Sequence, residues 1–401
     1  MTSTIDKIIR NPQSYIDKTV TISGRYYYRR GPFIDIEGET GYIQVYFEKN
    51  GLKNACDISS GNFVAINGKV GYTNKGKLCI FANSSEVLSK NRRSFKMEKL
   101  SHSLKKFSSA VYNREKRRII TVSNQIVSSL REVLNNEDFT EVLTPTLITE
   151  DMGVKAKSFK VANVYELRRD HDLDTRAHLL FMPKVFQIGQ VFRDEGISSR
   201  YKPEFIMSNI FALEQDYTTM TKILIRTLQL CKERDNQFNL PETVFIRNFE
   251  ECVEDKPGKE VKMEYREVVN EIKESQLKLL GVYNNLDWKL FRKNKKSYIQ
   301  NPTFIVGIPP KVNPLSKVDI RSGYSESAQF VWQARTVAHF CNEENDESQL
   351  RTGNSKGEGL YREILEYGLP TFCGMGINLE SLIQAELKLK NVWDIFPSLL
   401  R

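Results

Sequence analysis

Residues 1–93 alternate between hydrophobic and polar positions in short runs that glycine and asparagine separate. Alternation over roughly four to eight residues between turn residues is typical of half-buried β-strands. Five runs fit this description, at residues 20–24, 33–36, 41–47, 63–66 and 77–81. Five strands in this order predict a small OB-fold β-barrel, although an SH3-like barrel would give a similar pattern.

Near residue 113 the hydrophobic positions change to steps of three and four residues. The residues concerned are Ile119, Val122, Ile126, Val127, Leu130, Val133 and Leu134. This spacing predicts a helix with one apolar face, and a second helix is expected over 220–234. The basic stretch 89–93 is interpreted as an exposed linker between two domains, 1–93 and 94–401. The polar, charge-rich residues 235–300 are interpreted as a divergent insertion in the second domain.

The chain has 401 residues and a formal net charge of +9. Its length predicts two or three domains, and its charge fits a polyanionic partner about as well as a slightly basic enzyme. Six scattered cysteines without a C-x-x-C pair indicate free thiols in a reducing compartment. The sequence has neither a membrane-spanning apolar stretch nor a signal-peptide core, so we expect a cytoplasmic protein with no membrane partner.

The most informative segment is 185–196, an alternating stretch that leads into Arg193 and Glu195. Because strand residues two apart point to the same side of a sheet, Arg193 and Glu195 are expected to project to one face. An arginine fork can grip a phosphate, and the aromatic ring of Phe205 can lie beside a planar base. Residues 197–203 add two further cations, Arg200 and Lys202. Taken as isolated residues, they fit better with a surface ion pair and a solvated basic hairpin.

As a whole, residues 192–205 (FRDEGISSRYKPEF) resemble motif 2 of the class II aminoacyl-tRNA synthetases. The resemblance is to the lysyl-tRNA synthetases, in which a phenylalanine, an arginine and a glutamate precede G-I-S-T-R-H-N-P-E-F. The helix before residues 139–145 resembles motif 1, and residues 366–377 resemble the opening of motif 3. Residues 41–47 and 71–78 are similar to the anticodon-binding OB domain of that family.

This resemblance implies an N-terminal five-stranded OB-fold β-barrel followed by an α+β class II synthetase domain on a mixed antiparallel sheet. It also implies a homodimer formed through motif 1. Enzymes of the family bind ATP, activate an amino acid as its adenylate and transfer it to tRNA. The resemblance gives catalytic roles to Arg193, which would hold the α-phosphate, and to Glu195. The ATP-binding residues that it implies are Arg193, Arg200, Phe205, Gly374 and Gly376.

Several positions depart from the pattern of the family. Where motif 3 reads G-x-G-I-D-R, this chain has Asn378 and Leu379 at the last two positions, so the arginine that holds the γ-phosphate is missing. The glutamate that follows motif 2 is Asn209. Aligned without gaps, one Mg²⁺ carboxylate becomes Thr336 while Glu343 remains, and a hydroxyl is the poorer Mg²⁺ ligand. The lysine-recognising segment L-R-I-A-P-E-L is not recognisable in residues 165–172.

Loss of one charge contact to a transition state commonly costs ~10²–10³ in rate. The sequence therefore favours a lysyl-tRNA synthetase-like protein with a degenerate active site, which binds tRNA or a nucleotide while aminoacylation is lost or strongly reduced. ATP is the expected cofactor, and Mg²⁺ binding is expected to be weakened. A divergent but active lysine-tRNA ligase is the first alternative, and a dimeric scaffold that binds no nucleic acid is the second.

The first strand of the barrel and its turn place arginines beside aromatic residues, namely Arg25, Arg29, Arg30, Tyr26, Tyr27, Tyr28 and Phe33. Bases stack on such rings at ~1–3 kcal/mol each, while arginines hold phosphates. We therefore expect tRNA or another structured RNA to bind at Arg25, Arg29, Arg30 and Phe33. In the alternative interpretation, alternate tyrosines fill the barrel core and the arginines are solvated.

Overall fold

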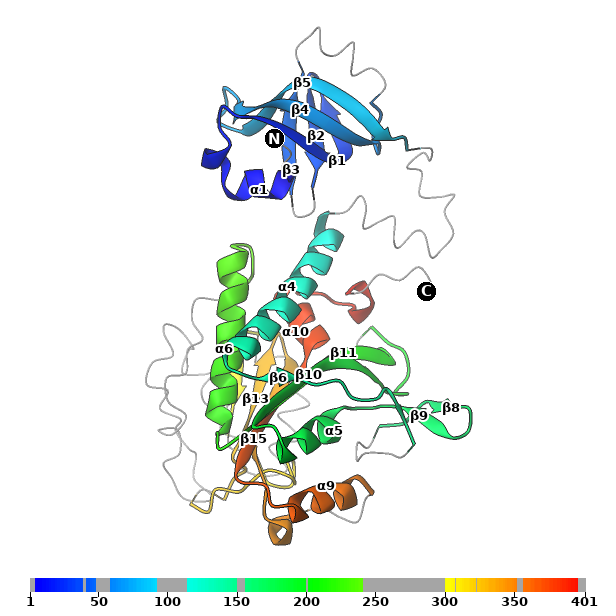
Figure 1. Cartoon of the computed structure of the whole chain (residues 1–401), viewed down its shortest axis with the longest axis vertical. Coiled ribbons are helices and arrows are strands. Elements are labelled where there is room, and N and C mark those ends of the chain that lie inside the picture. The colour runs from blue at the N-terminus through cyan, green and yellow to red at the C-terminus, as the bar shows by residue number, and fades with distance from the viewer. Residues whose placement is uncertain are drawn as a thin grey trace. The chain divides into compact units, whose positions relative to one another are not determined.

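The structure is a computed structural model that describes residues 4–38, 41–47, 58–91, 114–149, 156–199, 201–240, 300–306, 308–321, 323–351 and 356–395. The chain forms two compact units, one of Met1–Thr121 with Pro397–Arg401 and one of Val122–Phe396 (Figure 1). Most of the predicted insertion at 235–300, and the end of the predicted linker, lie outside the described residues. Within the described ranges, no helix is both long and apolar enough to cross a membrane.

The first unit contains the five strands that the alternating pattern predicts. They are β1 (Thr19–Arg30), β2 (Phe33–Glu37), β3 (Tyr42–Tyr46), β4 (Phe63–Tyr72) and β5 (Leu78–Ser89). They close into a barrel in the order β1-β2-β3-β5-β4, in which only β3 and β5 pair in parallel. Alternate residues such as Ile34 and Val45 fill the interior, and α1 (Ile5–Arg10) adds Ile5 and Ile8 to the same core.

A β-bulge in β1 decides which tyrosines face the core. Tyr26 pairs with Ile36 and Tyr28 pairs with Asp35, so Tyr27 is an extra residue in β1. Regular alternation would place Tyr26 and Tyr28 on one face, but the bulge separates them. Tyr26 is 6% exposed and Tyr28 is 54% exposed. The interpretation of alternate tyrosines as core residues therefore holds for Tyr26 and is wrong for Tyr28.

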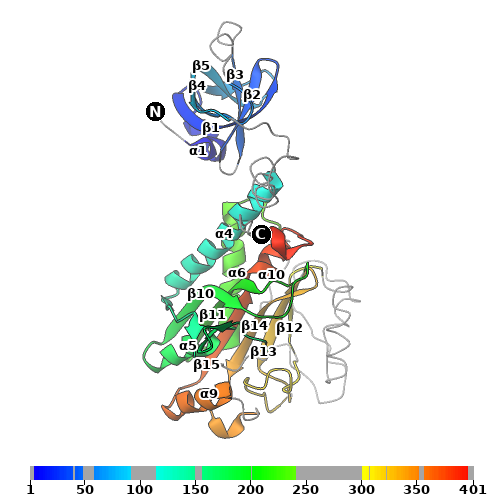
Figure 2. The same ribbon diagram turned by 90° about the vertical axis from the view of Figure 1, so that its right-hand side faces the viewer.

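The second unit is built on a seven-stranded mixed sheet. Its order is β12 (Thr303–Ile305), β13 (Ser327–Trp332), β14 (Arg335–Glu343), β15 (Phe372–Asn378), β11 (Glu204–Leu213), β10 (Lys184–Phe192) and β6 (Thr140–Glu141). All neighbours are antiparallel except β6 and β10, so the mixed, mainly antiparallel sheet that was expected is confirmed (Figure 2). A small sheet joins β7 (Leu147–Ile148), β9 (Tyr165–Leu167) and β8 (Lys160–Val161).

Both predicted helices are present. α4 (Arg114–Asn136) buries one apolar stripe that includes Val122, Ile126 and Leu130. It lies beside α6 (Tyr217–Arg234) (Figures 1 and 2). Gln125 of α4 donates a hydrogen bond of 2.5 Å to the Cys231 carbonyl of α6. α6 begins one turn earlier than predicted because the Asp216 side chain accepts from the first free backbone amides.

Three further helices position the site. They are α5 (Asp172–Ala177), α9 (Lys356–Glu366) and α10 (Leu379–Glu386). Phe211 of β11 packs in one core cluster with Leu173 of α5 and with Tyr361 and Ile364 of α9. α10 contacts β11 and β14. The central strands are therefore buried on both faces, and polar side chains that they carry must find partners inside the fold.

Candidate active site

The β10–β11 hairpin carries the segment that resembles motif 2. β10 ends at Phe192, and one more ladder hydrogen bond, from the Arg193 amide to the Pro203 carbonyl at 2.8 Å, closes the hairpin. Glu195 lies in the exposed loop beyond it, where Gly196 turns the chain with a φ of +85°. The prediction that one strand projects Arg193 and Glu195 to the same face is therefore wrong. Arg200 lies outside the described residues.

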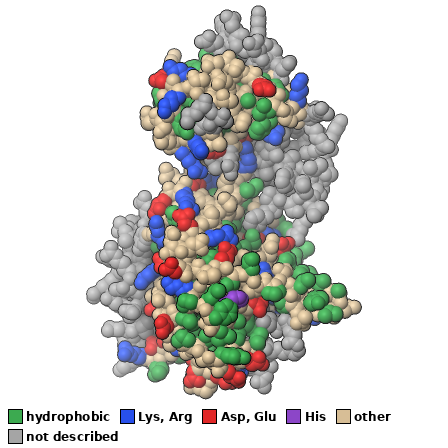
Figure 3. Space-filling view, in the orientation of Figure 1, with side chains coloured by type: hydrophobic (Ala, Val, Ile, Leu, Met, Phe, Trp, Pro, Cys, Tyr) green, Lys and Arg blue, Asp and Glu red, His purple; other side chains and the backbone are tan. Residues whose placement is uncertain are grey.

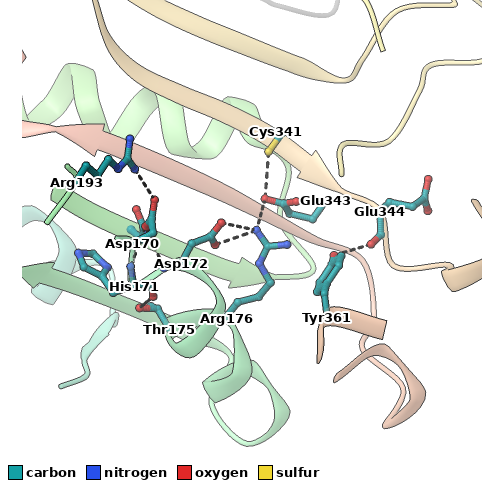
Figure 4. A network of polar contacts seen from close by, with 11 residues as sticks. Asp170, His171, Asp172, Thr175, Arg176, Arg193, Cys341, Glu343, Glu344 and Tyr361 are labelled. Carbon is teal, nitrogen blue, oxygen red and sulfur yellow. Dashed lines mark hydrogen bonds and ion pairs between the residues drawn. The ribbon is translucent and has the colours of Figure 1, made fainter. Parts of the chain in front are cut away.

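The Arg193 guanidinium is held inside the unit by polar and aromatic neighbours. Its Nη2 donates to Asp170 Oδ2 at 3.1 Å (Figure 4). Its Nε donates to the Arg169 carbonyl at 3.0 Å. Its carbon Cζ lies 5.2 Å from the centre of the Phe205 ring, within the range of a cation–π contact. The structure thus brings Arg193 and Phe205 together, but it also gives Arg193 a carboxylate partner.

Asp170 is the centre of this cluster, and the sequence did not single it out. Its Oδ1 accepts from Asn209 Nδ2 at 2.7 Å and from the amides of His171 and Asp172 at 2.9 and 3.1 Å. Asn209 lies opposite Gly376 in the β11–β15 register. Burial lowers the pKa of His171 to about 4, so this ring is uncharged at neutral pH. The strongest charge beside Arg193 is therefore the Asp170 carboxylate.

The strand that resembles motif 3 leads directly into α10. A Cβ on Gly374 would lie 2.5 Å from Cε1 of Phe211, so only glycine fits there without a shift. Asn378 caps α10, because its side-chain oxygen accepts from the Ser381 amide at 2.9 Å. Leu379, in the place of the arginine of the family, is 1% exposed. It is a core residue of the helix and carries no charge to the site.

A buried ion pair joins the hairpin to α10. Lys202 Nζ lies 2.7 Å from Glu380 Oε1, and the two side chains are 9% and 3% exposed. Burial raises the pKa of Glu380, and Lys202 opposes that shift. The sequence shows both charges, but their pairing follows from the approach of the hairpin to α10. Lys202, whose partner Glu380 directly follows Leu379 in sequence, is thus already neutralised.

The two residues aligned with metal carboxylates do not meet. Thr336 and Glu343 are seven residues apart on β14, which separates them by roughly 20 Å at ~3.3 Å per residue. Oε1 of Glu343 accepts from Arg176 Nη2 and from Cys341 Sγ, both at 3.1 Å. Burial raises the pKa of Glu343, an effect that Arg176 opposes. The described residues contain no cluster of three potential metal ligands, and this donor set does not fit Mg²⁺.

One more acidic residue was missed, and the sequence did hold a signal for it. When L-R-I-A-P-E-L is placed without gaps on residues 167–173, its glutamate falls on Asp172. Asp172 is the first residue of α5, and its carboxylate pairs with Arg176. A carboxylate side chain is therefore retained at this position, although several neighbouring residues differ.

The candidate RNA-binding residues of the barrel lie in the first unit. Arg25 donates to the Gly61 carbonyl at 2.7 Å, and Arg29 donates to the Gly31 carbonyl at 3.0 Å. Arg30 is exposed. Its Cζ lies 5.8 Å from the centre of the Tyr28 ring, and its Nη2 lies 3.8 Å from Asp35 Oδ2. Arg25 and Arg29 are thus tied to backbone, while Arg30 and Tyr28 form an exposed cationic and aromatic pair.

Phe33 belongs to an aromatic row that the sequence did not reveal. Its ring centre is 5.1 Å from that of Tyr46, which is 5.8 Å from that of Phe81. The three residues come from β2, β3 and β5, which are neighbours in the barrel. Tyr46 and Phe81 could have been found as aromatic residues at outward positions of their strands, but their proximity depends on the parallel pairing of β3 with β5.

Fold and site together define a class of protein. The sheet is mainly antiparallel, an arginine lies at the base of the β10–β11 hairpin, and a glycine-rich strand leads into a helix. Motifs 2 and 3 of class II synthetases imply this arrangement. The family model described as tRNA synthetases class II (D, K and N) matches residues 100–398. The chain belongs to this family.

Within the family, the chain is similar to lysine–tRNA ligases. Lysine–tRNA ligase 1 of Mycoplasmopsis pulmonis is 26% identical over 431 residues, which cover 94% of this chain and 86% of that protein. The lysine–tRNA ligase of Bordetella bronchiseptica is 26% identical over 451 residues, with coverage of 96% and 87%. That of Carboxydothermus hydrogenoformans is 25% identical over 462 residues, with coverage of 99% and 92%. The likeness thus extends over both units.

Proposed function

We propose that this lysyl-tRNA synthetase-like protein binds a nucleotide and tRNA or another structured RNA, while its aminoacylation is lost or strongly reduced. The observation that carries the proposal is the ion pair between Arg193 and Asp170. The arginine aligned with the α-phosphate contact already has an internal anion, and Leu379 supplies no second cation. The family match and the similarity to lysine–tRNA ligases support ATP and tRNA as ligand classes.

Formation of an adenylate places additional negative charge around the α-phosphorus, and preorganised cations are usually the largest source of rate enhancement. In this chain Arg193 pairs with Asp170 and Lys202 pairs with Glu380. A pairing of this kind must be broken before the cation can stabilise the transition state, which reduces the gain. The carboxylate at Glu343 is bound to Arg176, so the described residues supply no metal site that would take over this role.

Nucleotide binding is the part of the activity that the geometry supports. Phe205 is half-buried on β11 and Arg193 lies against its ring, an arrangement that suits a base and a phosphate next to each other. Gly374 and Gly376, two residues apart on β15, place no side chain on one face of the neighbouring strand at these two positions. We propose that adenine stacks on Phe205 and that a phosphate reaches Arg193 in competition with Asp170.

Lysine-dependent exchange of pyrophosphate with ATP tests the loss of activation. We expect the rate of the wild-type chain to equal that of an Arg193→Ala variant and to lie at least ~10³-fold below a bacterial lysine–tRNA ligase assayed in parallel. The reason is that Arg193 and Lys202 are each already paired with a carboxylate. Exchange clearly above the Arg193→Ala variant would instead support a divergent active ligase, with Lys202 beside α10 as a replacement cation.

We further propose that the barrel is an OB fold that binds RNA. The closed strand order β1-β2-β3-β5-β4 supports this assignment. The row of Phe33, Tyr46 and Phe81 offers stacking platforms for bases. Arg30, which is close to Phe33 in sequence, offers an exposed charge for a phosphate. Stacked bases and phosphate contacts are the two terms that bind single-stranded segments of RNA.

Gel shifts with tRNA at several salt concentrations test this surface. We expect Arg30→Ala to weaken binding and to reduce the slope of log K against log [salt] by about one, because one phosphate contact is lost. Lys7→Ala, which removes an exposed cation from α1, is the matched control and should leave the slope unchanged. Wild-type protein that gives no salt-sensitive shift would support the scaffold alternative.

Homodimerisation is proposed from the exposed apolar side chains of the second unit. Figure 3 shows hydrophobic side chains gathered on one face of this unit. Leu143, which follows β6, is 86% exposed, and Val164 and Phe181 are also exposed. The helix before residues 139–145 resembles motif 1, the dimer-forming element of the family, so exposed apolar side chains directly after it support the proposal of a dimer. We also propose that the protein acts in the cytoplasm.

A further inference from the structure

The loop of the β10–β11 hairpin is bound to a segment that follows α10. The indole Nε1 of Trp393 donates to the Ser198 carbonyl at 2.8 Å. The amide of Val392 donates to the Ser199 carbonyl at 2.9 Å. Both donors belong to the 3₁₀ helix η6 (Val392–Asp394). Because the two acceptors are consecutive residues, the two hydrogen bonds fix the orientation of the loop as well as its position. We call residues 391–395 the latch.

The latch is anchored in the body of the second unit. Val392 and Ile395 are 5% and 0% exposed, so both side chains lie in the core. Just before the latch, Arg335 of β14 donates a hydrogen bond of 3.1 Å to the Leu389 carbonyl. These contacts hold the donors in place independently of the hairpin, so the latch can restrain the loop and does not merely follow it.

The loop that the latch holds is exposed. Residues 194–199 are all exposed, and Ile197 is 76% exposed. Connecting segments of this kind usually open at a low cost in free energy, because they bury little apolar surface. Here the side chains face water while the main chain is bound at Ser198 and Ser199. The order of this loop therefore depends on a segment 195 residues later in the chain.

We propose that the latch holds the hairpin loop in one position before any ligand is bound. Arg193 and Phe205 border this loop in sequence. In many enzymes a loop beside the site becomes ordered only when the ligand arrives. A ligand that contacts Arg193 in this chain would meet a loop that is already ordered, so less of its binding energy is spent on ordering. The proposal does not depend on which ligand binds, and it is tested without one.

Hydrogen–deuterium exchange of the full chain, followed by mass spectrometry of its peptides, tests the latch. Trp393→Phe keeps an aromatic ring and removes the indole donor. Exchange in the peptides that cover residues 194–203 should become roughly threefold to tenfold faster, because one hydrogen bond no longer opposes opening of the loop. The Tm should fall by less than about 4 °C, since the rest of the fold is unchanged.

Val392→Pro removes the other donor by an independent route. Proline is tolerated at the first position of a helix, and Asn391 already has a φ of −122° and a ψ of 121°, which the residue before a proline favours. This variant should also speed exchange in the loop, and the double variant with Trp393→Phe should exchange faster than either single variant.

Lys184→Met is the matched control. Lys184 begins β10 at the end away from the loop, where its Nζ donates to the Glu137 carbonyl at 2.9 Å. Its loss should leave exchange at 194–203 unchanged. If the double variant does not fold, the two single variants decide. Exchange in both single variants that stays at the wild-type rate, or that rises equally throughout the second unit, would overturn the proposal.

Discussion

Replacing Asp170 with asparagine is expected to tighten the binding of ATP about tenfold to a hundredfold. Asp170 lies 3.1 Å from Arg193 and would lie next to any phosphate that Arg193 holds. Two like charges ~5 Å apart repel by about 3 kcal/mol at an effective dielectric constant of ~20, and each 1.4 kcal/mol is about a factor of ten. The amide keeps the shape of the side chain and removes both the repulsion and the competing ion pair. Isothermal titration with ATP, without and with Mg²⁺, measures the change.

Two variants separate this mechanism from a general charge effect. Asp174→Asn removes a carboxylate of α5, close to Asp170 in sequence, whose charged neighbours are Arg168 and His178, so it should leave the affinity close to that of the wild type. In an Arg193→Ala background, Asp170→Asn should lose most of its gain. This prediction rests on the proposed nucleotide binding. Equal affinities of Asp170→Asn and wild type would show that Asp170 does not compete with phosphate.

Lys202→Met is expected to destabilise the second unit by about 3–5 kcal/mol at neutral pH, because it leaves the Glu380 carboxylate buried without its cation. The apolar stem of lysine is largely kept, so little packing is lost. The matched control is Arg226→Met, which breaks an ion pair with Glu233 at 2.7 Å whose side chains are 52% and 56% exposed. An exposed pair contributes roughly 0–1 kcal/mol. Urea unfolding of both variants measures the difference.

The loss in Lys202→Met should depend on pH in a defined direction. Burial raises the pKa of Glu380 above its ordinary value, and removal of Lys202 raises it further. A group with a raised pKa in the folded state binds a proton more tightly there than in the unfolded chain, so low pH favours folding and the benefit is lost as pH rises. The deficit should thus be smaller at about pH 5 than at about pH 8. A deficit that is the same at both would contradict the buried pairing.

Local elements were predictable because each depends on its own residues. The five barrel strands follow from alternation, since the inside of a small barrel is apolar and its outside is polar. The helix α4 follows from the spacing of Val122, Ile126 and Leu130, which form one buried face. The departures at Leu379, Thr336 and Asn209 can be read directly from the chain, as can the segments that place it in its family.

The partners of the charged groups were decided by the tertiary structure alone. Asp170 reaches Arg193 because β10 and β11 hold the hairpin beside the start of α5, and Glu380 reaches Lys202 because α10 contacts β11. Arg176 and Glu343 meet across 167 positions of sequence. A sequence pattern records which side chains share an element, but the energy of a buried charge depends on what lies within a few ångströms in space. The sequence therefore determined which charges are present, and the fold decided which of them remain available to a ligand.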